Sequence, residues 1–220
     1  PGAIIAPSPT FADDEEAQAA LTSWGPGFYD PRWNLDTISD PVTIPPIYGL
    51  SEVPLATYTG DGPTSCWNQY VGVTQMGGQG VFYDSRIAVA VLQTPDLVTP
   101  KLPALYDYQI SLETPEVDVS GLDAEQVERG RAVFAGVGEC ATCHSGEMFT
   151  DVSERLHDPA ETAMEPTHAL RSATGLYRTT PLRALALHPP YFHDGSAPTL
   201  EEVVTHYNTA LELNLSEAQR

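Results

Sequence analysis

The five residues Cys140-Ala-Thr-Cys-His144 constrain this chain more than any other feature of its sequence. Two thiols three positions apart, followed directly by a histidine, form the attachment signature of a c-type haem. Each thiol can add to one vinyl group of the porphyrin, and the imidazole of His144 can then bind the iron. A zinc cage would need a second Cys-x-x-Cys, which the sequence lacks, and no strand precedes the motif as a thioredoxin-like pair would require. Cys140, Cys143 and His144 therefore predict one covalently bound haem c.

The charge balance excludes one class of partner and suggests another. The chain has 10 Lys and Arg against 30 Asp and Glu, a formal net charge of −20. It offers no basic surface for nucleic acid, and no segment has the roughly 20 apolar residues of a membrane span. Instead we expect a redox partner protein with a basic docking surface. Because c-type haem is attached after export, we expect a periplasmic or extracellular location in a bacterium.

The content of glycine and proline bounds the fold. With 17 Gly and 20 Pro in 220 residues, long irregular loops and few regular elements are expected. We predict a mainly α fold with low strand content, built from cytochrome c-like haem domains. A helix over residues 123–135 leads into the haem motif, with Asp123 and Gln126 as a capping box. Gly130 in that helix either allows close approach of another helix or is merely tolerated.

Three further helices are predicted from local signals. Residues 13–24 read as an acidic helix start followed by an apolar face, and residues 101–112 as a second helix. Thr199 is expected to cap a short helix whose first turn is acidic. Ser216 with Gln219 forms a capping box for a helix that stops after one turn.

Two separated segments carry a resemblance to a known family. Residues 177–208, which include Tyr-Phe-His-Asp-Gly at 191–195, together with the haem motif resemble the carboxy-terminal haem domain of the bacterial di-haem cytochrome c peroxidases. That family includes the di-haem enzyme that matures the tryptophylquinone cofactor, and the resemblance covers about residues 121–208. It implies that residues 177–208 build the wall of the haem site opposite His144.

The sixth ligand of the iron stays open at this point. Peroxidases of the family have a methionine where this chain has Tyr207, and the tryptophylquinone-maturing relative uses tyrosine there. The resemblance thus favours Tyr207 as the second metal ligand beside His144. His206 is adjacent but points about 100° round the helix, and Met148 and Met164 lie in loops that could reach the iron.

Three other side chains are candidates for contact with the cofactor. Arg178 and Arg183 lie in the segment facing the haem and are predicted to pair with its propionates. His193 is predicted to donate to a propionate or to couple a proton to electron transfer. The alternatives are exposed loop arginines and a loop histidine bonded to the backbone.

The first half of the chain repeats part of the second in weaker form. Residues 43–50 and 58–62 resemble residues 180–185 and 191–195. We therefore predict a partial cytochrome c-like module over residues 1–112, a linker over 113–121 and a c-type cytochrome domain over 122–220.

The first module has no attachment motif of its own, yet Met76 falls near the family's axial methionine. It is predicted to contact a second haem, or else to be a loop methionine beside glycines. Since the final helix is also short, we expect the chain to be a segment of a longer multi-haem protein or to pair with a second chain.

Two function classes follow from these features. The main prediction is an electron-transfer cytochrome with one covalent haem. The alternative is part of a di-haem peroxidase-like enzyme that reduces hydrogen peroxide, or of a related haem oxygenase. Cys66 is expected to be a buried free thiol, or to bond to a missing segment.

Overall fold

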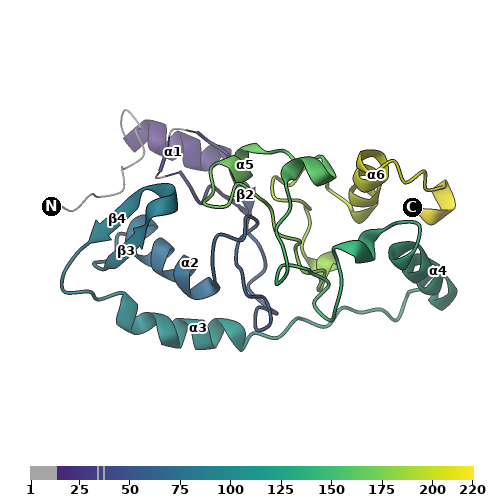
Figure 1. Ribbon diagram of the computed structural model, residues 1–220, viewed down its shortest axis with the longest axis horizontal. Coiled ribbons are helices and arrows are strands. Elements are labelled where there is room, and N and C mark those ends of the chain that lie inside the picture. Colours follow the sequence, from purple (N-terminus) through teal and green to yellow (C-terminus); the bar gives the residue numbers. More distant parts are fainter. Residues whose placement is uncertain (1–13, 34, 37) are drawn as a thin grey trace.

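The computed structural model describes residues 14–33, 35–36 and 38–220, and its elements are spread along an elongated molecule (Figure 1). The α-helices are α1 (Asp14–Ser23), α2 (Thr64–Tyr70), α3 (Leu102–Ile110), α4 (Ala124–Ala135), α5 (Thr167–Leu170) and α6 (Leu200–Ala210). The strands are β1 (Phe28–Tyr29), β2 (Val42–Thr43), β3 (Val81–Asp84) and β4 (Val89–Leu92). A π-helix covers Val71–Gln75, and 3₁₀ turns cover Ser85–Ile87, Thr99–Lys101, Cys140–Thr142, Pro159–Thr162, Leu185–Leu187 and Glu217–Gln219.

Loops form more of this fold than helices and strands together. Helical residues make up 36% and strand residues 9%, so the prediction of low strand content is confirmed. The architecture is mixed rather than mainly α, because proline and glycine keep long stretches out of regular structure. Within the described part of the chain, no helix has both the length and the apolar character needed to cross a membrane.

The helix starts predicted at Asp123 and Thr199 are present, and side-chain hydrogen bonds cap both. Asp123 caps α4 by accepting from the amide of Gln126 at 2.9 Å. At α6, Thr199 Oγ1 accepts from the Glu202 amide at 3.2 Å while the Glu202 carboxylate accepts from the Thr199 amide at 3.0 Å. Such bonds satisfy amides that have no partner within the helix. The one-turn helix predicted after Ser216 is the 3₁₀ turn over residues 217–219.

Gly130 in α4 does not allow the close approach of another helix, which was one of its two predicted roles. A Cβ added at Gly130 would meet no atom of the described residues within 4 Å, so no neighbouring helix approaches there. Glycine is tolerated at this position. Phe134, one turn further on, instead contacts the haem-motif loop, with ring centroids 6.5 Å from His144 and 6.2 Å from Phe149.

The main apolar core lies in the amino-terminal half, between α2 and a hairpin that we did not predict. Strands β3 and β4 pair antiparallel with Phe82 opposite Val91. Alternate side chains point inward, so Phe82, Val89 and Val91 pack against Tyr70 and Val73, all at most 4% exposed. The outward residues of the hairpin face solvent. On its other side α2 contacts α3, where Asn68 and Gln109 exchange hydrogen bonds of 2.6 and 3.1 Å.

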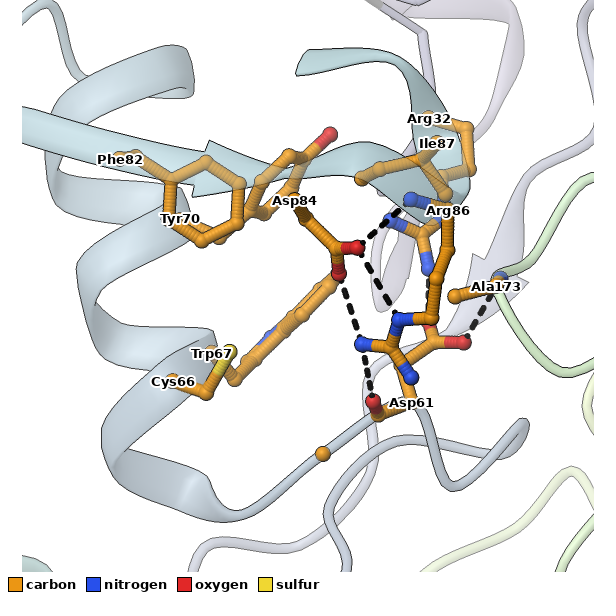
Figure 2. A pocket seen from close by; sticks show the side chains of 11 residues that line it. Arg32, Asp61, Cys66, Trp67, Tyr70, Phe82, Asp84, Arg86, Ile87 and Ala173 are labelled. Atoms are coloured by element: carbon orange, nitrogen blue, oxygen red, sulfur yellow. Dashed lines mark hydrogen bonds and ion pairs between the residues drawn. The ribbon is translucent and has the colours of Figure 1, made fainter. Parts of the chain in front are cut away.

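Buried ion pairs join the two halves of the chain. Arg32 and Asp61, which are 2% and 9% exposed, form a salt bridge beside a small cavity, and Asp61 also accepts from the amide of Ala173 at 3.1 Å (Figure 2). The guanidinium of Arg32 lies 5.2 Å from the ring centroid of Trp67. Arg171 pairs with Asp30 at 3.2 Å, which again links the two halves. These contacts pack the two halves of the chain together. The predicted domain boundary at residues 113–121 remains a prediction.

The two segments that resemble each other in sequence share a local arrangement. Each forms a small loop closed by one antiparallel bridge, Ala56 with Gly62 in the first copy and Tyr191 with Ala197 in the second. A helix follows the bridge in both, α2 in the first and α6 in the second.

Candidate functional site

One cavity of about 230 Å³ in the carboxy-terminal half gathers most of the predicted site residues. It lies between the haem-motif loop and the segment that runs from Tyr177 into α6. The predicted residues that line it are Cys140, Cys143, His144, Met164, Arg178, Arg183, His193 and Tyr207. The remaining lining includes the apolar side chains of Pro46, Pro181, Leu182, Leu185, Pro190, Phe192, Leu200, Val203 and Leu211.

Local backbone geometry presents the motif to this cavity. A 3₁₀ turn over Cys140–Thr142 lets the amide of His144 donate to the carbonyl of Cys140 at 2.9 Å. The ring atom Nδ1 of His144 lies 3.0 Å from the carbonyl oxygen of Phe149, so Nδ1 donates and Nε2 remains available as a ligand. Burial lowers the pKa of His144, which favours the neutral imidazole that metals bind.

Helix α6 forms the wall that faces the motif. Leu200, Val203, Tyr207 and Leu211 recur at a spacing of three to four residues and all line the cavity, because this spacing puts them on one helix face. Burial, with the nearby thiols of the motif, raises the pKa of Tyr207 to about 12. In the absence of a metal the phenol of Tyr207 is therefore protonated at neutral pH.

Two arginines bring positive charge to the cavity, and neither forms a salt bridge with a carboxylate of the described residues. Arg178 is 8% exposed and donates to the carbonyl of Leu55 at 3.0 Å, and Arg183 donates to the carbonyl of Glu147. The Nε atoms of both are buried and have no hydrogen-bond acceptor among the described residues. Burial lowers the pKa of Arg178 to about 10, which still leaves it charged at neutral pH. Guanidinium groups that keep a buried Nε donor without an acceptor fit an anionic ligand.

His193 is 4% exposed. Its hydrogen-bond partner is not the backbone group that one of the sequence-based alternatives expected. Its Nε2 lies 3.0 Å from the phenol oxygen of Tyr177. The ring therefore bonds to a side chain rather than to the backbone. Tyr177 also lines the cavity, and no role had been predicted for it.

Three other predicted ligands lie elsewhere. Met76 follows the π-helix and is 79% exposed, so its sulfur is on the surface of the amino-terminal half and outside the cavity. His206 Nε2 bonds to the carbonyl of Thr162 at 2.8 Å, as expected for a ring turned away from the site. Met148 does not line the cavity, which leaves Tyr207 and Met164 as the candidate sixth ligands within it.

A buried network beside the motif was missed by the sequence interpretation. His157 Nε2 lies 3.0 Å from both Asp151 Oδ2 and Thr179 Oγ1, and its Nδ1 lies 3.1 Å from Glu161. The ligand-type atoms of Asp151 and His157 come within 4.8 Å of the Cys143 sulfur, a spacing that a metal ion could bridge. If the Cys143 sulfur formed a thioether with haem, it could not also bind such a metal ion as a thiolate. Only the sequence separation of six between Asp151 and His157 hints at the pair, and such separations are common.

Cys66 is a free thiol in the amino-terminal half, half-buried against the core. Burial raises its pKa. It lies outside the cavity, and it is half-buried where a buried free thiol was expected.

The cavity residues together fit a c-type haem. The donor set supplies two thiols and an imidazole with a free nitrogen, and the lining supplies apolar surface for a porphyrin. The orphaned Nε atoms of Arg178 and Arg183 supply donors for its propionates. No other cofactor class requires this combination.

Comparison with known proteins confirms the resemblance to the di-haem peroxidase family. The chain is 37% identical to the methylamine utilization protein MauG of Methylorubrum extorquens over 100 residues, 41% of this chain and 27% of MauG. It is 33% identical to cytochrome c551 peroxidase of Nitrosomonas europaea over 129 residues, 54% of this chain and 36% of the peroxidase. The matches thus span about a third or less of these relatives. No protein-family model matches the chain.

A solved structure shares the fold. It is described as a MauG-like protein associated with microbial copper homeostasis, with a TM-score of 0.50 and 20% sequence identity. The match covers 77% of this chain and 59% of that protein.

Proposed function

Because the chain is a relative of MauG proteins and cytochrome c peroxidases, we propose that it is the haem-binding electron-transfer part of a di-haem peroxidase-like oxidoreductase. In this role it holds one covalent haem c and passes electrons to a second haem where peroxide is reduced. The relatives favour this reading over an independent single-haem cytochrome, which was our first expectation from the sequence.

The observation that carries the proposal is the joint placement of the motif and the two arginines. Cys140 and Cys143 would form the thioethers, and His144 Nε2 would bind the iron. Arg178 and Arg183 would each pair with a propionate through donors that have no other acceptor in the described chain. A bound haem supplies reversible one-electron chemistry at its iron. The apolar side chains that α6 contributes to the cavity would exclude water from the bound group.

We propose Tyr207 as the sixth ligand, since it faces the motif from α6 and is already desolvated. Replacing Tyr207 with phenylalanine is expected to remove an oxygen donor and to raise the reduction potential of the haem, because an anionic oxygen favours the ferric state. Absorption and EPR spectra of the ferric form, with a potentiometric titration, measure both effects. Tyr191→Phe is the matched control, because Tyr191 lines the same cavity but donates to the Leu185 carbonyl at 3.0 Å. An unchanged spectrum in Tyr207→Phe would assign the ligand elsewhere, with Met164→Leu as the next variant.

The function itself is tested by mixing the haem-loaded chain with a basic electron-donor cytochrome and, separately, with hydrogen peroxide. We expect the donor to reduce the haem, and the rate to fall as salt rises, because the chain carries a net charge of −20. We expect no direct reaction of this haem with peroxide, since its iron is six-coordinate in the proposal. Rapid reaction with peroxide would show an open haem and contradict the electron-transfer role. Salt-independent reduction would contradict docking through the acidic surface.

We also propose a periplasmic or extracellular location, since haem is joined to such motifs after export. Fractionation of cells that express the protein tests this, and haem-loaded protein confined to the cytoplasm would contradict it.

A further inference from the structure

His157 is buried beside the haem motif with a carboxylate at each nitrogen of its ring. It is 6% exposed and lines the haem cavity. Its Nε2 lies 3.0 Å from Asp151 Oδ2 and 3.2 Å from Asp151 Oδ1, and its Nδ1 lies 3.1 Å from Glu161 Oε2. The imidazole is therefore held between two acidic side chains.

Neither neutral form of this ring fits both contacts. A neutral imidazole carries one N–H group and one nitrogen with a lone pair. With the proton on Nδ1, the lone pair of Nε2 would face the Asp151 carboxylate, and the Thr179 hydroxyl at 3.0 Å from Nε2 would not remove that repulsion. With the proton on Nε2, the lone pair of Nδ1 would face Glu161. An imidazolium has an N–H group on each nitrogen and can donate to both carboxylates.

Both carboxylates are ionised at neutral pH and held in place. Glu161 Oε1 accepts from the amide of Asp158 at 3.0 Å, which keeps Oε2 at the ring. That bond, together with His157, lowers the pKa of Glu161. Burial raises the pKa of Asp151, but the hydrogen bond from Thr179 and the charge of His157 outweigh burial and lower it. A protonated acid therefore does not take the place of the second N–H group of the ring.

The charges around His157 balance only when its ring is charged. Arg155 Nε lies 3.4 Å from Asp151 Oδ2, and an Nη atom of Arg155 lies 3.5 Å from Glu161 Oε2. Two carboxylates thus face one guanidinium and the imidazole. From the haem motif, a thioether would carry no charge, and burial favours the neutral form of His144 by lowering its pKa. A neutral His157 would leave one negative charge uncompensated beside the cavity.

We propose that His157 is a buried imidazolium whose positive charge raises the reduction potential of the haem bound in this cavity. Reduction adds negative charge to the haem, so a nearby positive charge favours the ferrous state. This effect would oppose that of an anionic Tyr207 ligand, which favours the ferric state. The inference rests on the proposed function in one respect, namely that this haem receives electrons from a donor. His157 would then set the driving force of that step without binding the iron.

The charge of the ring is tested by nitrogen NMR of the full chain with isotope-labelled histidine, before and after haem loading. The loaded sample is reduced and kept under carbon monoxide, because low-spin ferrous iron is diamagnetic. At about pH 8 an ordinary histidine, with a pKa of about 6.5, shows one protonated and one unprotonated nitrogen. We expect two protonated nitrogens in His157 at that pH, in signals that are absent from His157→Gln. A neutral pattern at His157 would overturn the inference, whether or not haem binds.

The effect on the haem is tested by potentiometric titration of haem-loaded His157→Gln, since glutamine removes the charge and keeps an amide donor. At a fixed ambient potential, we expect the ratio of ferrous to ferric haem to fall about tenfold, the scale of a unit charge at about 10 Å with an effective dielectric constant of about 20. His188→Gln is the matched control. His188 lines the same cavity, and no carboxylate of the described residues forms a salt bridge with it.

An unchanged ratio in His157→Gln would overturn the inference, as would an equal fall in His188→Gln. The absorption spectrum of each variant reports whether the iron ligands are intact, so a loss of ligation is not mistaken for a loss of charge. A pyridine haemochrome assay on the same samples measures haem loading. Absence of haem would contradict the proposed function, while the NMR spectrum of the unloaded chain would still decide the charge of His157.

Discussion

Replacing both Cys140 and Cys143 with alanine is expected to abolish covalent haem attachment, from about one haem per chain to none. Each thioether requires a thiol, and among the described residues the cavity contains no others. Intact-mass analysis and haem staining after denaturing electrophoresis measure the loss. Each single variant should keep one thioether and shift the pyridine haemochrome band, since one vinyl group stays unsaturated.

Cys66→Ala is the matched control for this experiment. Cys66 is also reduced and half-buried, but it packs against the amino-terminal core and does not line the haem cavity. The Cys66 variant should retain full haem content. Haem that survives denaturation in the double variant would show that the motif is not the attachment site, and loss of haem in Cys66→Ala would implicate general misfolding.

Replacing Asp61 with asparagine is expected to lower the free energy of unfolding by about 3–5 kcal/mol. The change removes the negative charge beside Arg32, which is 2% exposed (Figure 2). Burial already lowers the pKa of Arg32, so an unpaired charge there is costly. Because Asp61 also accepts from Ala173, the loss should loosen the contact between the two halves. Urea unfolding followed by circular dichroism measures the effect.

Glu125→Gln is the matched control, since it makes the same carboxylate-to-amide change at a surface ion pair. The Glu125 side chain is 92% exposed and lies 3.9 Å from Arg129, so its loss should cost less than about 0.5 kcal/mol. If Asp61→Asn were no more destabilised than Glu125→Gln, the buried pair would contribute little to stability.

The helices that the sequence predicted well are those whose ends are fixed locally. Asp123 and Thr199 accept from amides three residues later, within one turn of chain. The haem motif is equally local, because two thiols and an imidazole within five residues suffice to define the chemistry. These features can be predicted without knowing how distant segments of the chain pack together.

The β3–β4 hairpin was missed although its strands carry a readable signal. Val81-Phe-Tyr-Asp84 and Val89-Ala-Val-Leu92 are rich in β-branched and aromatic residues. The hairpin's inward side chains became the main core only through contact with α2, and no property of the strands alone fixes that contact.

The tertiary structure reduced the number of candidate ligands for the haem iron. Met148, Met164, His206 and Tyr207 are chemically acceptable partners for the iron bound by His144, and the family resemblance favoured Tyr207 among them. Met76 was predicted to contact a second haem. The fold leaves Met76 79% exposed and turns His206 to a carbonyl, while Met164 and Tyr207 line the cavity.

The sequence by itself thus determined the haem motif, the starts of α4 and α6 and the acidic character of the chain. Only the tertiary structure decided that Arg178 and Arg183 keep unpaired donors and that Tyr177 meets His193. The physical reason is the range of the interactions involved. Caps and covalent motifs depend on neighbours within one turn of chain, whereas burial and the pairing of distant polar groups depend on how the loops close over the cavity.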